Sequence, residues 1–403
     1  MRVPVTGKVF TEEDKQALID CINSGEEITY GSYNVKFEKM LAKYTGVSHA
    51  FFVNSGSSAN LLAFAAFTSP DMYEKWRVQP GDEIITLAAG FPTTVAPIVQ
   101  YGCVPVFVDI DRDTYNIDIS YLEEARSSRT RGVFIAHTLG NPFAVKTVKD
   151  FCTRHNLFLI EDACDALGSE YDHQKCGSFG DVSTYSFYPA HHITTGQGGA
   201  VLTSDPLIAK IIRSMRGWGK ECVCPPNQDD VCGRRFTQQH GKLPFGYDHK
   251  YVFSNFGYNL QGTNLLAALG CSQMKHIEEF SKRRRDNFEV LKYALRNTRV
   301  GMMEAYASSY PAWFGFPILL PNYLIRRDIV NQLSERGIET RTLFAGNIIK
   351  QPCFTKNSTV KYRQVGDLYN TDLVMDQMFW TGVWHGLSPE QIDYLAKSLV
   401  EVL

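Results

Sequence analysis

The sequence predicts an α/β fold built on a mostly parallel β-sheet. Between residues 50 and 204, short apolar runs alternate with segments of helical periodicity. Runs that are apolar nearly throughout are typical of strands covered by helices on both faces. Three runs end in polar residues, at Asn54-Ser55, Asp162 and Ser186. Because ligands of such sheets bind at the carboxyl ends of the strands, these residues mark the expected site.

The expected elements follow in chain order. The predicted strands are residues 50–55, 82–87, 104–110, 132–138, 157–164, 181–187 and 198–204. The predicted helices between the early strands are residues 57–67, 93–102, 120–128 and 148–156.

The sequence pattern changes after Asn259. A helical stretch runs from Thr263 to Leu295, and its charge run at residues 278–286 is interpreted as a solvated helix face. A small α+β unit follows, with a strand at 313–320, a helix at 326–337 ending near Gly337, and a last helix at 388–403. We therefore expect a large domain, 1–280, and a small C-terminal domain, 281–403. The boundaries allow the N-terminal segment to pack on the small domain.

Composition excludes several functions. The 403 residues are 44% hydrophobic and 21% charged, with a formal net charge of −2. This balance argues against nucleic acid or an anionic membrane as the main partner. The N-terminus lacks the apolar region of a secretory signal, and no apolar stretch is long enough to span a bilayer. A cytoplasmic protein is predicted.

A small-residue loop, Asn54–Asn60, joins the first strand to a helix. At Gly56, Ser57 and Ser58 the backbone N–H groups can approach an anion, and a helix N-terminus favours negative charge. A helix capped by serine explains the same residues, so phosphate binding stays one of two interpretations.

Asp162 ends an otherwise apolar strand. A carboxylate there is costly unless it is paired, and a pyridinium nitrogen is one cation that would pair with it. A helix-capping aspartate is the alternative.

The segment from Ser186 to Ala200 completes a recognisable set. Its residues Ser186-Phe187-Tyr188-Pro189-Ala190-His191 are followed by Ile193-Thr194 and Gly198-Gly199. With the loop and Asp162, this order resembles the DegT/DnrJ/EryC1/StrS sugar aminotransferases over nearly the whole chain. The resemblance implies the fold-type-I, pyridoxal-phosphate-dependent aminotransferase fold, with a mostly parallel seven-stranded sheet.

One departure from the family pattern changes the expected chemistry. The family's cofactor lysine falls at His191, and imidazole cannot form the Schiff base that lysine makes. It can move protons near neutral pH. Histidine here is similar to the 3-dehydrases of deoxysugar biosynthesis. This resemblance implies that pyridoxamine 5′-phosphate is bound noncovalently and that His191 is the catalytic base.

The spacing of four cysteines indicates which kind of 3-dehydrase the chain resembles. Cys164, Cys222, Cys224 and Cys232 have the spacing C-x57-C-x-C-x7-C. From the residues alone, zinc, an iron–sulfur cluster and plain buried cysteines all remain open. The spacing resembles that of the iron–sulfur 3-dehydrases, which act on CDP-4-keto-6-deoxyglucose. That resemblance implies a [2Fe–2S] cluster on these thiols.

The resemblance also implies roles for further residues. Phe91 matches the aromatic side chain that stacks on the pyridine ring, although a core phenylalanine is the alternative. Ser57, Ser58 and Ser186 match phosphate ligands. Asn259 matches a residue that reaches the phosphate in the neighbouring subunit, which implies a homodimer with shared active sites. Asp165 and Tyr188 stand where aminotransferases commonly have Gln and His.

Together these features predict a nucleotide-sugar dehydrase. Removal of the C3 hydroxyl of a CDP-4-keto-6-deoxyhexose would proceed through a pyridoxamine phosphate ketimine. Electrons would pass through the cluster from an NADH-dependent iron–sulfur flavoprotein reductase. Such a reaction serves 3,6-dideoxyhexose and lipopolysaccharide biosynthesis. Three alternatives remain: a cluster-bearing enzyme for a TDP- or GDP-linked sugar, a metal-free dehydratase using glutamate, and a non-enzyme with structural zinc.

Overall fold

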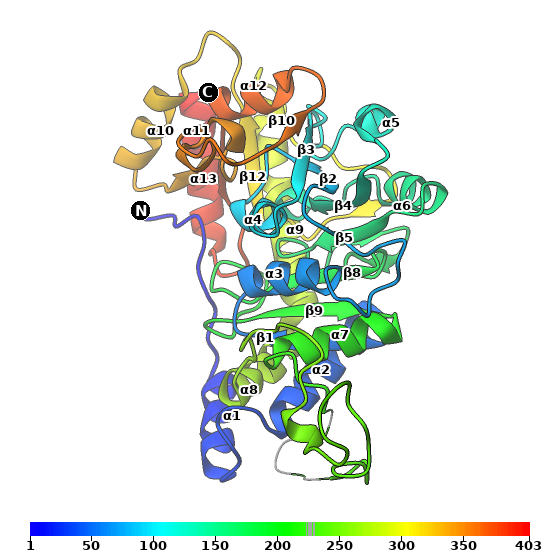
Figure 1. Ribbon diagram of the computed structural model, residues 1–403. Helices are drawn as coiled ribbons and strands as arrows, with labels where there is room; N and C mark the ends of the chain where they lie inside the picture. The colour runs from blue at the N-terminus through cyan, green and yellow to red at the C-terminus, as the bar shows by residue number, and fades with distance from the viewer. Residues whose placement is uncertain (223, 225–227, 229) are drawn as a thin grey trace.

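A central β-sheet organises the protein (Figure 1). The computed structural model describes residues 1–222, 224, 228 and 230–403. The sheet has the strand order β1-β9-β8-β5-β4-β2-β3-β14. Its strands are β1 (His49–Val53), β2 (Glu83–Leu87), β3 (Val104–Val108), β4 (Thr130–Ala136), β5 (Phe158–Asp162), β8 (Val182–Ser186), β9 (Gly199–Thr203) and β14 (Arg363–Gln364).

Seven of these strands match the prediction, and the mostly parallel character is confirmed. Only β9 runs against its neighbours, pairing antiparallel with both β1 and β8. The predicted count of seven is corrected to eight, because the two-residue strand β14 from the C-terminal region pairs with β3. A two-residue strand carries no periodic signal, so sequence inspection passes over it.

Helices cover both faces of the sheet. On one face lie α3 (Gly56–Ala66), α4 (Pro92–Gln100) and α7 (Pro206–Arg216), packed on β1, β3, β8 and β9. On the other lie α6 (Val145–Arg154), against β5, and α2 (Ser32–Thr45), against β1. Both layers bury apolar side chains, so each strand is apolar nearly throughout.

The C-terminal region forms its own antiparallel sheet, in the order β10-β12-β15-β13. Its strands are β10 (Gly301–Met302), β12 (Gly315–Leu319), β13 (Thr340–Arg341) and β15 (Met378–Gly382), and its helices are α10 (Arg326–Glu335), α12 (Tyr369–Gln377) and α13 (Pro389–Val402). The N-terminal residue Val3 pairs with Ile338 here. The chain then descends to α1 (Glu12–Asn23) at the other end of the molecule (Figure 1).

The link between the two sheets is helical. The predicted helix from Thr263 is two helices, α8 (Asn264–Gln273) and α9 (Ile277–Leu295), joined by a 3-10 turn. Helix α9 runs through residue 280, so the domain boundary placed there stays a prediction. Within the described part of the chain, no helix is both long and apolar enough to cross a membrane.

Candidate active site

Asp162 lies at the carboxyl end of β5 and is buried on the face of the sheet that α3 and α4 cover. Its Oδ2 accepts hydrogen bonds from Asn60 Nδ2 at 2.8 Å and from Thr94 Oγ1 at 2.7 Å. Its Oδ1 accepts from the backbone N–H of Cys164 at 3.2 Å. These neutral donors hold the carboxylate but bring no compensating charge. A buried carboxylate held in this way is suited to pair with a cation that enters the site.

The adjacent Glu161 shows what an internally satisfied carboxylate looks like. It points to the opposite face of β5, where His137 Nε2 lies 2.9 Å away and the backbone N–H of Phe179 donates at 2.7 Å. Although burial raises the pKa of Glu161, the hydrogen bond and charge of His137 and the backbone N–H groups of Gly180 and Gly177 lower it overall. Strand alternation thus separates a structural carboxylate from one that faces the site.

The N-terminus of α3 meets the end of β8. Ser55 caps the helix by accepting from the Ser58 N–H at 3.1 Å. Gly56 packs so closely on Ser186 that an added Cβ would lie 2.5 Å from the serine Cβ. Ser57 is exposed at the helix start. N–H groups and hydroxyls therefore gather at a helix start, where an anion is favoured. The serine cap is confirmed, and phosphate binding at the same place stays a prediction.

His191 lies in the turn after Tyr188, whose carbonyl accepts from the His191 N–H at 2.9 Å. Its Nδ1 is 3.3 Å from Oδ1 of Asp165, which is ion-pair distance. Burial raises the pKa of Asp165, while His191 and Arg284 act in the opposite direction without cancelling the shift. The fold therefore brings together two residues that were predicted separately as site residues, His191 and Asp165.

Arg284, which we did not predict as a site residue, supports this pair. Its exposed fraction is 0%, and it donates to the backbone carbonyls of His191 at 3.1 Å and of Trp313 and Phe314 at 3.3 Å. Burial lowers its pKa to about 9, and Asp165 partly offsets this. The interpretation of residues 278–286 as a solvated face is thus wrong at this position. Helical periodicity places Arg284 with Phe280 and Phe288 on the buried side of α9.

Replacing Arg284 with methionine should destabilise the fold and disturb the site. Each carbonyl left without a donor costs about 1–3 kcal/mol. Because Arg284 lowers the pKa of Asp165, that pKa should rise further, and the carboxylate paired with His191 would be lost at a higher pH. Urea unfolding and the acid limb of the pH–rate profile test both effects. The exposed Arg283→Met variant is the control, and an unmoved acid limb would remove Arg284 from the network.

Two predicted aromatic residues line the open side of the site. Phe91 caps α4 and is 50% exposed, while Tyr188 is 51% exposed. The ring of Phe344 meets Phe91 edge-on, with centroids 6.2 Å apart. Phe344 has a φ of 41°, unusual for a bulky residue and typical of functional sites. Only the fold reveals Phe344 as a neighbour of Phe91, and the core interpretation of Phe91 is not supported.

Asn259 lies elsewhere, on an exposed segment beside β1. Its neighbour Leu260 accepts from the Asn54 N–H at 3.0 Å, and Asn259 itself pairs with Gly217. Its predicted reach into a neighbouring subunit stays a prediction.

The predicted cluster ligands fall into two groups. Cys222, Cys224 and Cys232 interact with one another in the loop after α7, and Cys164 lies beside Asp162 and Asp165. Burial acts to raise the pKa of Cys224, but hydrogen bonds from backbone N–H groups and thiols lower it overall. Burial and the two carboxylates raise that of Cys164. In the described part of the chain, no three Cys, His, Asp or Glu side chains stand close enough together to hold a metal ion. As placed in one chain, these residues do not fit a four-thiolate cluster.

A mostly parallel sheet with one antiparallel strand, and a buried aspartate at the end of a central strand, define the fold class of the pyridoxal-phosphate-dependent aminotransferases. The solved structure of GDP-4-keto-6-deoxy-D-mannose-3-dehydratase from E. coli with bound hydrated PLP matches with a TM-score of 0.88 and 28% identity, covering 99% of each chain. The chain belongs to the DegT/DnrJ/EryC1/StrS aminotransferase family, whose profile matches residues 8–400.

Three named relatives are similar to this chain over most of their length. The lipopolysaccharide biosynthesis protein RfbH of Salmonella typhimurium is 49% identical over 403 residues, covering 99% of this chain and 91% of that protein. The dTDP-4-dehydro-2,6-dideoxy-D-glucose 3-dehydratase of Saccharopolyspora spinosa is 46% identical, covering 98% and 85%. The GDP-4-keto-6-deoxy-D-mannose 3-dehydratase of Escherichia coli O55:H7 is 31% identical, covering 86% and 87%.

Proposed function

We propose that this protein is a pyridoxamine phosphate-dependent dehydrase that removes the C3 hydroxyl of a nucleotide-linked 4-keto-6-deoxyhexose. The observation that carries the proposal is His191. It stands at the position of the family's cofactor lysine and is paired with the half-buried Asp165, whose charge interacts with that of buried Asp162. The named 3-dehydratases among the relatives support the reaction class. We propose a CDP-linked sugar as the substrate, with TDP- and GDP-linked sugars as alternatives.

The residues present fit a B6 cofactor. Asp162 would hold the pyridinium, since its other partners are neutral donors. The N-terminal N–H groups of α3, with Ser57, Ser58 and Ser186, would hold the phosphate. Phe91 would stack on the ring. Family structures with bound PLP support this assignment.

The chain's own side chains then supply proton movement and orientation. The bound cofactor provides an amine for the ketone and a ring that accepts electrons. His191 would take the proton from the cofactor's C4′ carbon and later return one. Asp165, 3.3 Å from Nδ1, would hold the imidazole in the right orientation and stabilise its charged form. Tyr188, exposed at the same opening, would contact the sugar.

Loss of the hydroxyl leaves a sugar that must gain electrons to become the 3-deoxy product. We propose that Cys164, Cys222, Cys224 and Cys232 would hold a [2Fe–2S] cluster, which would supply one-electron transfer from a separate NADH-dependent iron–sulfur flavoprotein. The support is the cysteine spacing and the mutual hydrogen bonding of the loop thiols. We also propose a homodimer in which Asn259 reaches the partner's phosphate site.

Anaerobically purified protein should contain pyridoxamine phosphate, iron and sulfide, and a Cys222→Ser variant should lose the cluster absorbance. Without the cluster, elimination should continue but reduction should stop. Quantified iron, sulfide and B6, with turnover of CDP-, TDP- and GDP-linked substrates, test this. Cys353→Ser, at an exposed cysteine outside the set, is the control. An iron-free protein that turns over with glutamate alone would favour the metal-free dehydratase. Stoichiometric zinc without B6 would favour the non-enzyme.

A further inference from the structure

Phe344 occupies a tight turn in a conformation that is costly for its residue type. The Gly346 N–H donates to the carbonyl of Leu343 at 2.8 Å, which closes the turn. Phe344 is the second residue of this turn, and its φ is 41°. A positive φ at that position favours glycine, because a Cβ crowds the backbone there. A phenylalanine at a position that favours glycine indicates that its ring has a use outside the turn.

Two backbone hydrogen bonds attach this turn to the edge of the sheet that carries Asp162. The Ile348 N–H donates to the carbonyl of Ala88 at 3.1 Å, and the Ala345 N–H donates to that of Gly90 at 3.4 Å. Both acceptors lie between β2 and α4. Since β2, β4 and β5 are parallel, this is the edge at which Asp162 ends β5. The turn therefore stands beside the place where the cofactor ring is proposed to bind.

The chain just before the turn is linked to His191. The indole N–H of Trp380 donates to the carbonyl of Thr342 at 3.0 Å. The ring of Phe314 contacts both Trp380 and His191, with centroid separations of 5.6 Å and 5.2 Å. The segment 342–348 thus connects the His191 side of the site to the Asp162 side. Phe344 lies in sequence between these two attachments, so its backbone position is fixed from both directions.

The rings of Phe344 and Phe91 form an apolar corner at the site. They meet edge-on, with centroids 6.2 Å apart, and both side chains are partly exposed. Carbon atoms of the two rings are thus open to a ligand. A methyl group gains free energy by leaving water for such a surface. A hydroxyl group loses hydrogen bonds there, because carbon atoms cannot replace them.

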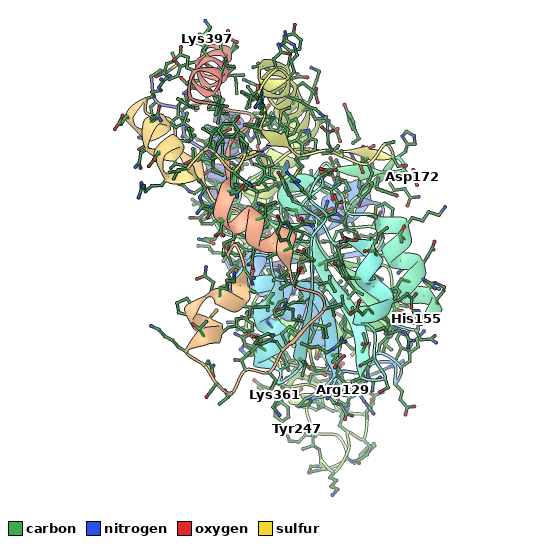
Figure 2. All side chains as sticks on the ribbon, turned by 90° about the horizontal axis from the view of Figure 1, so that it is seen from above. Arg129, His155, Asp172, Tyr247, Lys361 and Lys397 are labelled. Atoms are coloured by element: carbon green, nitrogen blue, oxygen red, sulfur yellow. The ribbon has the colours of Figure 1, made fainter. Side chains whose placement is uncertain are left out.

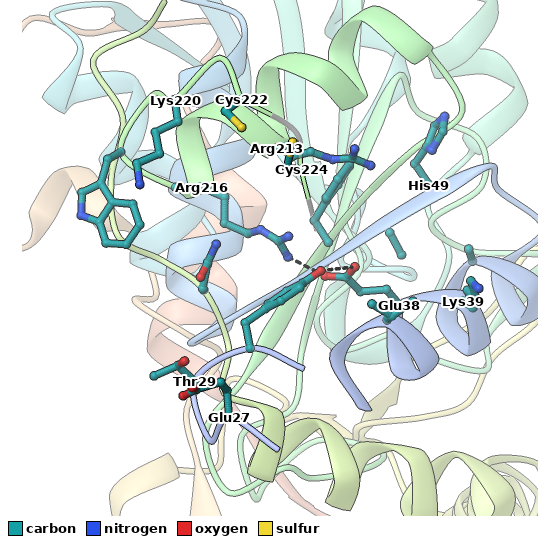
Figure 3. Close-up of a pocket in the computed structure, with 18 of the residues that line it drawn as sticks. Glu27, Thr29, Glu38, Lys39, His49, Arg213, Arg216, Lys220, Cys222 and Cys224 are labelled. Atoms are coloured by element: carbon teal, nitrogen blue, oxygen red, sulfur yellow. Dashed lines mark hydrogen bonds and ion pairs between the residues drawn. The ribbon is translucent and has the colours of Figure 1, made fainter. Parts of the chain in front are cut away.

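A cavity elsewhere in the chain has the opposite chemistry. It measures about 820 Å³ and lies beside β1, where the cationic side chains of Arg213, Arg216 and Lys220 line it (Figure 3). Such a lining suits an anion, and burial of a methyl group against charged groups is not favoured. Recognition of an apolar substituent is therefore assigned to the corner of Phe91 and Phe344.

We propose that Phe344 determines specificity by recognising the C6 methyl group of the sugar. This inference rests on the proposed function, because it concerns the substrate of the same site. In a 4-keto-6-deoxyhexose, C5 carries the methyl group and is bonded to the reacting carbon C4. The rings of Phe344 and Phe91 cover this methyl group, whereas a hexose that keeps its 6-hydroxyl places an oxygen against carbon atoms. An apolar wall of this kind discriminates by about 10- to 100-fold.

Binding of matched sugar pairs tests this assignment without turnover. Protein loaded with pyridoxamine phosphate is titrated calorimetrically with CDP-, TDP- and GDP-linked 6-deoxyhexoses and with the parent hexoses, all with a hydroxyl at C4 so that none reacts. Wild type should bind the 6-deoxy member of a pair about 10- to 100-fold more tightly, and Phe344→Ala should bring this ratio close to one. Phe344→Gly should lower the ratio equally but unfold at a higher temperature than Phe344→Ala, because glycine relieves the positive φ. Tyr323→Ala, at an exposed aromatic residue outside the site, is the control.

Three outcomes would overturn the proposal: a methyl preference that Phe344→Ala leaves unchanged, an equal loss of affinity for both sugars of a pair in that variant, and a wild type without preference in any pair. Bound pyridoxamine phosphate equal to wild type confirms the folding of each variant, and Phe344→Gln replaces an alanine variant that does not fold. A wild type whose preference depends on Phe344 but which never dehydrates a 4-keto sugar rejects the proposed function and leaves the recognition standing.

Discussion

Replacing His191 with alanine is expected to abolish dehydration while pyridoxamine phosphate remains bound. The imidazole is the only proposed base at the position that a lysine occupies in the aminotransferases. General acid–base catalysis contributes roughly 10²- to 10⁴-fold, so turnover should fall by about that factor. The phosphate and pyridinium partners, Ser186 and Asp162, are untouched, so binding of the cofactor should change little.

Single-turnover assays and exchange of the cofactor C4′ proton with deuterated water measure the effect. The control is His155→Ala, at a histidine at the periphery of the molecule (Figure 2), just before the amino end of β5 and so at the opposite end of this strand from Asp162. A variant that still exchanges the C4′ proton at the normal rate would exclude His191 as the base. A His191→Lys variant provides a gain of function: it should bind pyridoxal phosphate covalently, with the absorbance of a Schiff base.

The second large effect is expected for Asp162→Asn. The amide has the same shape, but it cannot neutralise a pyridinium, and its N–H₂ group faces donors from Asn60 and Thr94. Leaving a buried charge without its partner costs about 3–5 kcal/mol, which is roughly 10²- to 10⁴-fold in rate or affinity. Both turnover and retention of the cofactor should therefore fall.

Equilibrium dialysis of pyridoxamine phosphate and the spectrum of the bound ring measure this loss. Asp150→Asn, at an exposed position of α6, tests for a general effect of removing a carboxylate. Urea unfolding of both proteins without cofactor separates any loss of fold stability in the Asp162→Asn protein from its loss of cofactor binding. Normal turnover in this variant would mean that Asp162 is a capping residue only.

Local pattern was sufficient to locate the main elements of the fold. The seven long strands lie within a few residues of their predicted positions, because buried parallel strands need unbroken apolar runs. Elements and breaks that show no periodicity in the sequence were not predicted. The two-residue strands β13 and β14 exist only because a partner strand supplies hydrogen bonds. The break between α8 and α9 at residues 274–276 contains no proline or glycine that would have predicted it.

The same apolar patterns also predicted the site residues that lie at strand ends. Asp162 and Ser186 were found because a polar residue is unusual at the end of an apolar run. Arg284 was missed because one arginine in a charged run looks like its solvated neighbours. Only the phase of α9, which buries Phe280 and Phe288 with it, distinguishes Arg284. Phe344 was equally hidden, since its place beside Phe91 depends on how the C-terminal region packs.

The sequence by itself determined the sheet, the strand-end aspartate and the histidine in place of lysine, because each is written in adjacent residues. The tertiary structure alone decided which distant residues meet. It brought Asp165 and Arg284 to His191, and among the described residues it placed no three Cys, His, Asp or Glu side chains where they could hold a metal ion. The physical reason is that strand register and helix phase fix distances between segments, whereas cysteine spacing along the chain fixes none.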